Sequence, residues 1–110
     1  MAFTQKRLFG PAAAVTTATD TTAGRYVVPS ATTTIVKQII LCNTASTSAT
    51  VQVAVGTTAT AANRIISDMT LAANETASFN ASLVLATTEK LFFVASATSV
   101  TITVNGVEET

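Results

Sequence analysis

The sequence predicts an all-β protein, an antiparallel β-sandwich that is jelly-roll-like or immunoglobulin-like, with an extended N-terminal arm. Threonine and alanine form nearly two fifths of the 110 residues. Residues 49–56 alternate apolar and polar side chains, which is typical of a half-buried strand. Eight or nine such strand candidates occur, separated by frequent turns. Because the chain has no tryptophan and one cysteine, we do not expect a true immunoglobulin domain with its Cys…Trp…Cys framework.

A chain of 110 residues has room for one core. We expect residues 1–23 to form an extended arm or a first strand, and residues 24–110 to form the sandwich. Residues 5–9 predict a short strand that ends at Gly10-Pro11, and residues 12–24 an extended or irregular segment that reaches a neighbour. Gly10-Pro11 also interrupts the apolar stretch of a weak signal-peptide pattern, so we expect no secretion by that route.

The middle of the chain predicts strands in regular order. Residues 25–28 form a strand that ends at Pro29, and residues 33–42 form the longest strand, apolar on both faces at its end and therefore central. After a polar loop at 43–48, residues 49–55 should pair with that strand as a hairpin and bury alternate valines. A surface loop with a helical turn follows at 57–62.

The last part predicts further strands at 63–71, 76–80, 82–85, 89–96 and 99–104. Turns are expected at 72–75 and 86–88, where small and polar residues gather. Asn105-Gly106 is a dipeptide typical of tight turns. We therefore expect the final strand to end there and an acidic tail to follow.

The residues needed for most chemistry are scarce. The chain has no histidine, and Cys42 lies in an apolar strand, where a buried free thiol acts as a small hydrophobic group. Glu75 and Glu89 are the candidate carboxylate pair for acid–base catalysis, but the residues that flank them in the sequence indicate turn and strand-edge charges. The acids do not cluster as a metal site requires, and the four glycines are isolated. We predict no enzyme activity, no catalytic residue, no cofactor and no metal.

Charge and hydropathy also limit the classes of molecule that this protein is expected to bind. Charged residues make up 11% of the chain and the net charge is zero, so no basic stripe for nucleic acid exists. No apolar run reaches the length of a membrane-spanning helix. A surface with so few charges is typical of a protein that packs against neighbours. Phe3, Leu8 and Phe9 are the candidate interface residues; they either anchor a neighbouring subunit or fold back onto their own domain.

Several stretches of the sequence carry a family resemblance. They are Tyr26 through Pro29 to Asn43-Thr44, the alternating valines of 49–56, and residues 62–66, 71–75, 83–85 and 100–108. This pattern resembles small β-rich structural proteins of tailed bacteriophages. Related chains often have glycine where Asn74 stands, and asparagine can also adopt a positive φ. The resemblance covers residues 25–108 and carries no catalytic residues.

The resemblance implies a virion protein made in the host cytoplasm: a capsid decoration (cement) protein, a head-fibre base or a tail-associated subunit. Its partners would be other copies of itself, as a homo-oligomer, and major capsid or tail proteins. The alternative is a tail- or fibre-associated sandwich that binds a host receptor or a carbohydrate. Sugar-binding platforms usually stack tryptophan or tyrosine, and Tyr26 is the sole tyrosine here.

Overall fold

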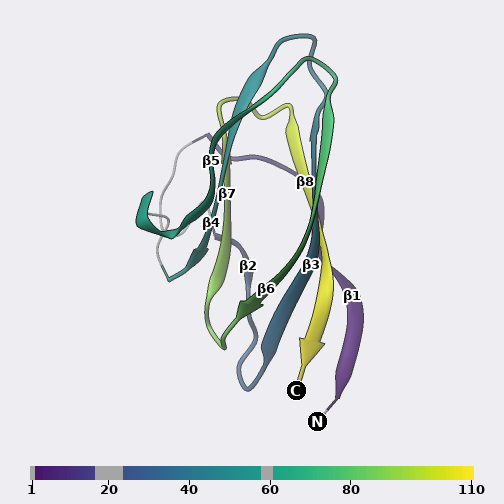
Figure 1. Cartoon of the computed structure of the whole chain (residues 1–110), viewed down its shortest axis with the longest axis vertical. Helices are drawn as coiled ribbons and strands as arrows, with labels where there is room; N and C mark the ends of the chain where they lie inside the picture. Colours follow the sequence, from purple (N-terminus) through teal and green to yellow (C-terminus); the bar gives the residue numbers. More distant parts are fainter. Residues whose placement is uncertain (1, 17–23, 58–60) are drawn as a thin grey trace.

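The computed structural model describes residues 2–16, 24–57 and 61–110 and shows two antiparallel sheets packed as a sandwich (Figure 1). The predicted antiparallel β-sandwich is therefore confirmed. Residues 3–13 of the expected arm form its first strand, which was one of the two alternatives, and residues 17–23 lie outside the described residues. The described elements are β1 Phe3–Ala13, β2 Gly24–Val27, β3 Thr33–Asn43, β4 Ala49–Gly56, the 3₁₀ turn η1 Ala61–Asn63, β5 Arg64–Leu71, β6 Thr76–Leu85, β7 Lys90–Ala95 and β8 Val100–Glu109.

The strand order is that of a jelly roll rather than an immunoglobulin sandwich. One sheet has the order β1-β8-β3-β6 and the other β2-β7-β4-β5. The first strand, β1, pairs with the last, β8. Moving inward along the sequence from both ends, β2 pairs with β7, β3 with β6 and β4 with β5. A chain folded in half and then rolled into two sheets gives this pattern. The ends of the described chain meet, since Ala2 and Thr110 exchange two backbone hydrogen bonds.

The core lies between the sheets and is made of the inward-facing side chains of both. Val51 and Val53 of β4 are fully buried, as their alternation predicts, and Val55 is partly buried. Most large buried side chains are aliphatic, with Phe93 as the main aromatic. Phe92 points the other way and packs with Ala54, Val15 and Val94 in a second, smaller cluster.

β1 is longer than the sequence predicts, because it continues through Gly10-Pro11 to Ala13. The register against β8 shifts at two places, between Arg7 and Phe9 and between Phe9 and Ala12. Gly10 has a φ of 82°, and a Cβ on it would stand 2.0 Å from the carbonyl oxygen of Ile102. Proline is tolerated here because β1 is an edge strand, where a missing N–H need not break the sheet. The predicted stop is therefore a bulge.

The expected hairpin of the two strands on either side of loop 43–48 is wrong. β3 and β4 belong to different sheets, so the loop carries the chain across the sandwich. β3 is central in its sheet, as predicted, but its side-chain alternation shifts by one at Lys37. Val36 and Ile39 both face inward as a result. The two strands predicted at 76–80 and 82–85 are one strand, β6, with an extra residue between Asn80 and Leu83.

Asn105-Gly106 is not a turn but part of β8. Glycine is needed here because neighbouring atoms leave no room for a side chain. A Cβ on Gly106 would stand 2.3 Å from the Ile35 carbonyl oxygen and 2.8 Å from Cδ1 of Leu8. Sequence patterns cannot separate these two uses of glycine. The turns predicted at 72–75 and 86–88 are present, with Asn74 at a φ of 57° and Thr88 at 69°.

Candidate functional site

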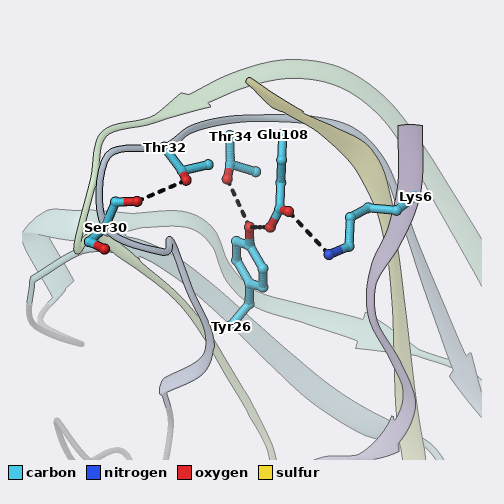
Figure 2. Close-up of polar contacts among 6 residues, drawn as sticks. All are labelled: Lys6, Tyr26, Ser30, Thr32, Thr34 and Glu108. Atoms are coloured by element: carbon cyan, nitrogen blue, oxygen red, sulfur yellow. Dashed lines mark hydrogen bonds and ion pairs between the residues drawn. The ribbon is translucent and has the colours of Figure 1, made fainter. Parts of the chain in front are cut away.

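The most connected buried ionisable group is Tyr26, at the end of the sandwich where the chain ends meet (Figure 2). Its ring is 8% exposed and belongs to the core. The hydroxyl donates to Oε2 of Glu108 at 2.5 Å and lies 2.8 Å from Oγ1 of Thr34. Oε1 of Glu108 accepts from Nζ of Lys6 at 3.1 Å. The four residues, which we call the Tyr26 cluster, come from β2, β3, β8 and β1.

The cluster shifts the ionisation of both acids in opposite directions. Burial, followed by the hydrogen bond to Glu108, raises the pKa of Tyr26 to about 12. The same hydrogen bond, aided by Lys6, lowers the pKa of Glu108 below its ordinary value. The phenol therefore stays protonated and the carboxylate stays charged at neutral pH. A protonated phenol that donates to a carboxylate is a poor base and a poor nucleophile.

This arrangement is suited to holding the two sheets together. Tyr26 comes from the β2-β7-β4-β5 sheet, whereas the other three residues of the cluster belong to the other sheet. Hydrogen bonds to charged groups contribute about 1.5–3 kcal/mol each when they are shielded. The Lys6–Glu108 ion pair adds less, because the Lys6 side chain is 45% exposed.

At the opposite end of the sandwich, Asn43 likewise holds separate parts of the chain together by hydrogen bonds. It is fully buried, and its Nδ2 donates to the carbonyl oxygens of Thr47, Leu71 and Ala72 at 2.8, 3.4 and 3.2 Å. Its Oδ1 accepts from the backbone N–H of Ala45 and from the hydroxyl of Ser99. One side chain thereby joins three connections: β3 to β4, β5 to β6 and β7 to β8. A satisfied buried amide of this kind fixes loop positions.

The two carboxylates weighed for catalysis have local structural roles. Oε1 of Glu75 accepts from the backbone N–H of Ala72, and Oε1 of Glu89 accepts from that of Ala86, both at 2.7 Å. Each glutamate thus closes a four-residue turn. They lie at opposite ends of β6, which is about 33 Å long at the usual rise per residue. Glycosidase carboxylates stand within about 10 Å of each other, so these two do not act on one bond.

The predicted interface residues have three different surroundings. Phe3 is 62% exposed at the start of β1. Leu8 is buried in the chain's own core, above Gly106, and Phe9 is partly buried against that core. Leu8 and Phe9 therefore fold back onto their own domain, which was one of the two alternatives, and Phe3 is the member of the set that faces solvent.

The two flanks of the sandwich are built differently. β1 contacts β2, and a four-residue turn joins β5 to β6, so the edges β1 and β2 share one flank and β5 and β6 share the other. We call the first the sealed flank, because Leu8 and Tyr26 are buried there. We call the second the open flank. Its large, partly buried core residues are Ile66, Met69, Phe79 and Leu83, with the smaller Ala77 beside them.

Two shallow depressions lie on the outer faces of the sheets. One, of about 280 Å³, is lined by Thr16, Thr50, Gln52, Val94, Ala95 and Ser96. The other, of about 410 Å³, is lined by Gln5, Lys6, Lys37, Asn105, Gly106 and Val107. Both are broad and open, unlike the enclosed apolar pockets that hold small ligands.

Within the part of the chain that the structure describes, no group of three or more Cys, Asp or Glu side chains is placed to hold a metal ion. The described residues also include no helix of the length and hydropathy that a membrane span needs. Comparisons with protein-family models, curated proteins and solved structures find no match.

Sequence reasoning missed the most connected residues. Glu108 was expected in an acidic tail, whereas Glu108 and Lys6 both belong to the Tyr26 cluster. Asn43 was assigned to a loop. A lone tyrosine in a chain with few ionisable groups was the available signal, because a buried phenol needs a partner.

Proposed function

We propose that this protein is a non-enzymatic structural protein of a bacteriophage virion that decorates or stabilises the capsid through protein–protein contacts. One observation supports this function most directly. The best-positioned ionisable and amide side chains, those of the Tyr26 cluster, Asn43, Glu75 and Glu89, are all bonded within the fold. The chain's polar chemistry thus maintains the scaffold, which is what a subunit with a purely structural task requires.

The surface is consistent with that task. Charged residues are 11% of the chain, well below the roughly 25% of ordinary soluble domains, so serine, threonine and alanine supply much of the exterior. Four large apolar side chains, Phe3, Val27, Ile65 and Val84, are 41–66% exposed. Desolvating such a surface on contact with another protein costs little, because few charges lose their water.

The particle is assigned by resemblance and by analogy of fold. The sequence resembles small β-rich virion proteins of tailed bacteriophages over residues 25–108. Jelly rolls are common in viral capsid domains, although the same architecture also serves lectins, and a fold alone does not fix a function.

The alternative, a tail- or fibre-associated sandwich that binds a receptor or carbohydrate, would need an exposed aromatic platform. Tyr26 does not supply one, because its ring is 8% exposed and its hydroxyl is bonded to Glu108 and Thr34. Among the described residues, no observation favours this alternative over the capsid role. A glycan array with the purified protein separates the two, since only the alternative predicts a saturable glycan signal.

Co-sedimentation tests the capsid role. Phage particles are collected from the organism that encodes this sequence and are separated into bands in a density gradient. An antiserum against the purified protein then shows which bands contain the protein. We expect the protein in the band of complete particles and in the band of tailless heads. Its absence from both bands would contradict the proposal, and its presence only in particles with tails would assign it to the tail.

A further inference from the structure

The two edges of the β1-β8-β3-β6 sheet differ in how they meet solvent. An edge strand presents unpaired backbone N–H and C=O groups, and natural sheets protect such edges with charges, prolines and bulges. β1 carries Lys6, Arg7 and Pro11 and has two register shifts against β8. All three kinds of protection are present on this one edge.

β6 has much less protection, although it is ten residues long. It contains no charged residue, no proline and no glycine, and one extra residue between Asn80 and Leu83 is its sole irregularity. Among the described strands, only β3 pairs with it. A cation on the neighbouring strand β3, Lys37, donates to the Ser82 hydroxyl. The free side of β6 is therefore a neutral edge, available for pairing.

The core is also less completely covered beside this edge. Phe79 and Leu83 face inward from β6, and Ile66 and Met69 face inward from β5, yet all four are only partly buried, although Leu71 and Leu85 at the ends of these strands are buried. At the other edge of the same sheet Leu8 is buried and Phe9 is partly buried. Exposed apolar residues by themselves do not distinguish the flanks, since each carries two. The difference lies in the core side chains that a neighbour on the open flank would cover.

We propose that the open flank binds a second copy of this chain by antiparallel pairing of β6 with β6, about a twofold axis near Asn80. This inference rests on the proposed structural function and names the surface through which copies associate. The pairing would extend the sheet across both subunits and cover the partly buried residues of β5 and β6.

A second copy fits this edge because the edge matches itself. The exposed residues of β6 are spaced evenly about Asn80 and are Thr76, Ser78, Asn80, Ser82 and Val84. A twofold axis at Asn80 therefore places Asn80 opposite Asn80, Ser78 opposite Ser82 and Thr76 opposite Val84, with no like charges on the paired strands. A partner with charged side chains at its edge would find no charged partner on β6.

The available area is sufficient for a stable dimer. β6 is about 33 Å long at the usual rise per residue, and the molecule is 24 Å across the two sheets (Figure 1). Complete coverage of that flank would bury up to roughly 800 Å² per copy, which is the standard size for specific interfaces. Pairing of β6 alone would bury less and give a weaker dimer.

A charge placed on each edge in turn tests the inference. Asn80→Lys puts a cation on β6, and Gln5→Lys puts the same charge on β1 of the same sheet, where Gln5 is also exposed. Sedimentation equilibrium at about 100 μM detects any complex of micromolar affinity. We expect the wild type and Gln5→Lys to have about twice the monomer mass of 11.3 kDa. Asn80→Lys should weaken dimerisation at least tenfold, because two lysines would meet at the axis.

A monomeric wild type, or an Asn80→Lys variant with the wild-type mass, would overturn the inference. So would an equal loss in both variants. Circular dichroism shows whether each variant is folded. A monomer that still bands with particles would refute the β6 dimer and leave the capsid role standing, whereas a β6 dimer absent from all particles would refute the capsid role alone.

Disulfide cross-linking supplies a second measurement that does not depend on a destabilising charge. In a Cys42→Ala background, single cysteines are placed at Ser78, Asn80 and, as the control on the other edge, Gln5. Opposed Cα atoms in antiparallel strands lie about 4.5–5.5 Å apart, within disulfide range. We expect Asn80→Cys to cross-link fastest, and Ser78→Cys more slowly. Faster cross-linking at Gln5 would overturn the proposed surface.

Discussion

The sealed and open flanks belong to one sandwich, yet their edge strands differ in charge and in how completely they cover the core. On the sealed flank, Leu8 enters the core above a glycine, and the Tyr26 cluster joins four strands. On the open flank, an uncharged edge strand lies beside core residues that are only partly covered. One edge of the same sheet is thus protected by charges, a proline and register shifts, whereas the other edge carries no charge.

The largest effect should come from the glycine on which the sealed flank depends. Gly106→Ala places a methyl group against the Ile35 carbonyl oxygen and the Leu8 side chain. We expect a loss of more than about 4 kcal/mol of unfolding free energy, in the range that few single substitutions reach. Urea denaturation measures it, with the exposed Ser78→Ala as a control that should change stability by less than about 0.5 kcal/mol. A tolerated Gly106→Ala would mean that Leu8 does not depend on this close approach.

A matched pair of leucines compares the edges directly. Leu8→Ala removes a buried side chain from β1, and we expect a cost of about 3 kcal/mol. Leu83→Ala removes a partly buried one from β6 and should cost about half as much in the monomer. If β6 is covered in a dimer, the cost of Leu83→Ala should grow as the protein concentration rises. Equal costs at low concentration would remove the distinction between the flanks.

The Tyr26 cluster should contribute less than the packing of Leu8. Tyr26→Phe keeps the ring and removes the hydroxyl, which leaves Glu108 with one partner fewer and Thr34 without this contact. We expect a loss of about 1.5–3 kcal/mol, as for other hydrogen bonds to charged groups. Thermal unfolding at neutral pH measures it. A change below about 0.5 kcal/mol would show that the cluster does not hold the sheets together.

The same cluster predicts a pH dependence. The pKa of Tyr26 is raised to about 12 in the folded protein, above its value near 10 in an unfolded chain. Its contribution is therefore complete below pH 10 and is lost as the pH rises from about 10 to 12. The lowered pKa of Glu108 acts in reverse: its contribution is present above the ordinary pKa of 4.5 and is lost as the pH falls below it. Tyr26→Phe should lack the alkaline component, which urea midpoints at pH 9 and about 11.5 would reveal.

The smallest effect on stability is expected at Phe3. Its side chain is 62% exposed, so Phe3→Ser should change the unfolding free energy by less than about 0.5 kcal/mol. If Phe3 anchors another virion protein, the variant should still dimerise through β6 but band less with particles. Unchanged banding would remove Phe3 from the interface. Deletion of residues 1–10 is a poorer test, because it would also remove Leu8 from the core.

The sequence predicted the parts of this fold that follow local patterns. Alternating valines located β4, and the small polar residues at 72–75 and 86–88 located two turns. It failed where distant contacts decide. Gly106 and Gly10 occupy places where another strand's backbone comes close, and no local signal distinguishes these from turn glycines. The pairing of β3 was mistaken because loop length alone does not show whether a chain returns to the same sheet or crosses to the other.

The candidate surfaces were less predictable. The sequence did not decide whether Leu8 and Phe9 join the core, because a first strand in a jelly roll pairs with the last, nearly 100 residues away. The open flank has no motif at all. Its properties are the lack of charge on β6 and the incomplete burial beside it, and only the strand order shows that β6 is an edge.

Hydrogen exchange of the edge-strand amides, measured over a range of protein concentrations, tests the difference between the flanks most directly. We predict that protection of amides in β6 rises with concentration while protection in β1 stays constant, because only β6 gains a partner strand. Protection that does not change with concentration at either edge, or that rises at β1 instead, would contradict the account.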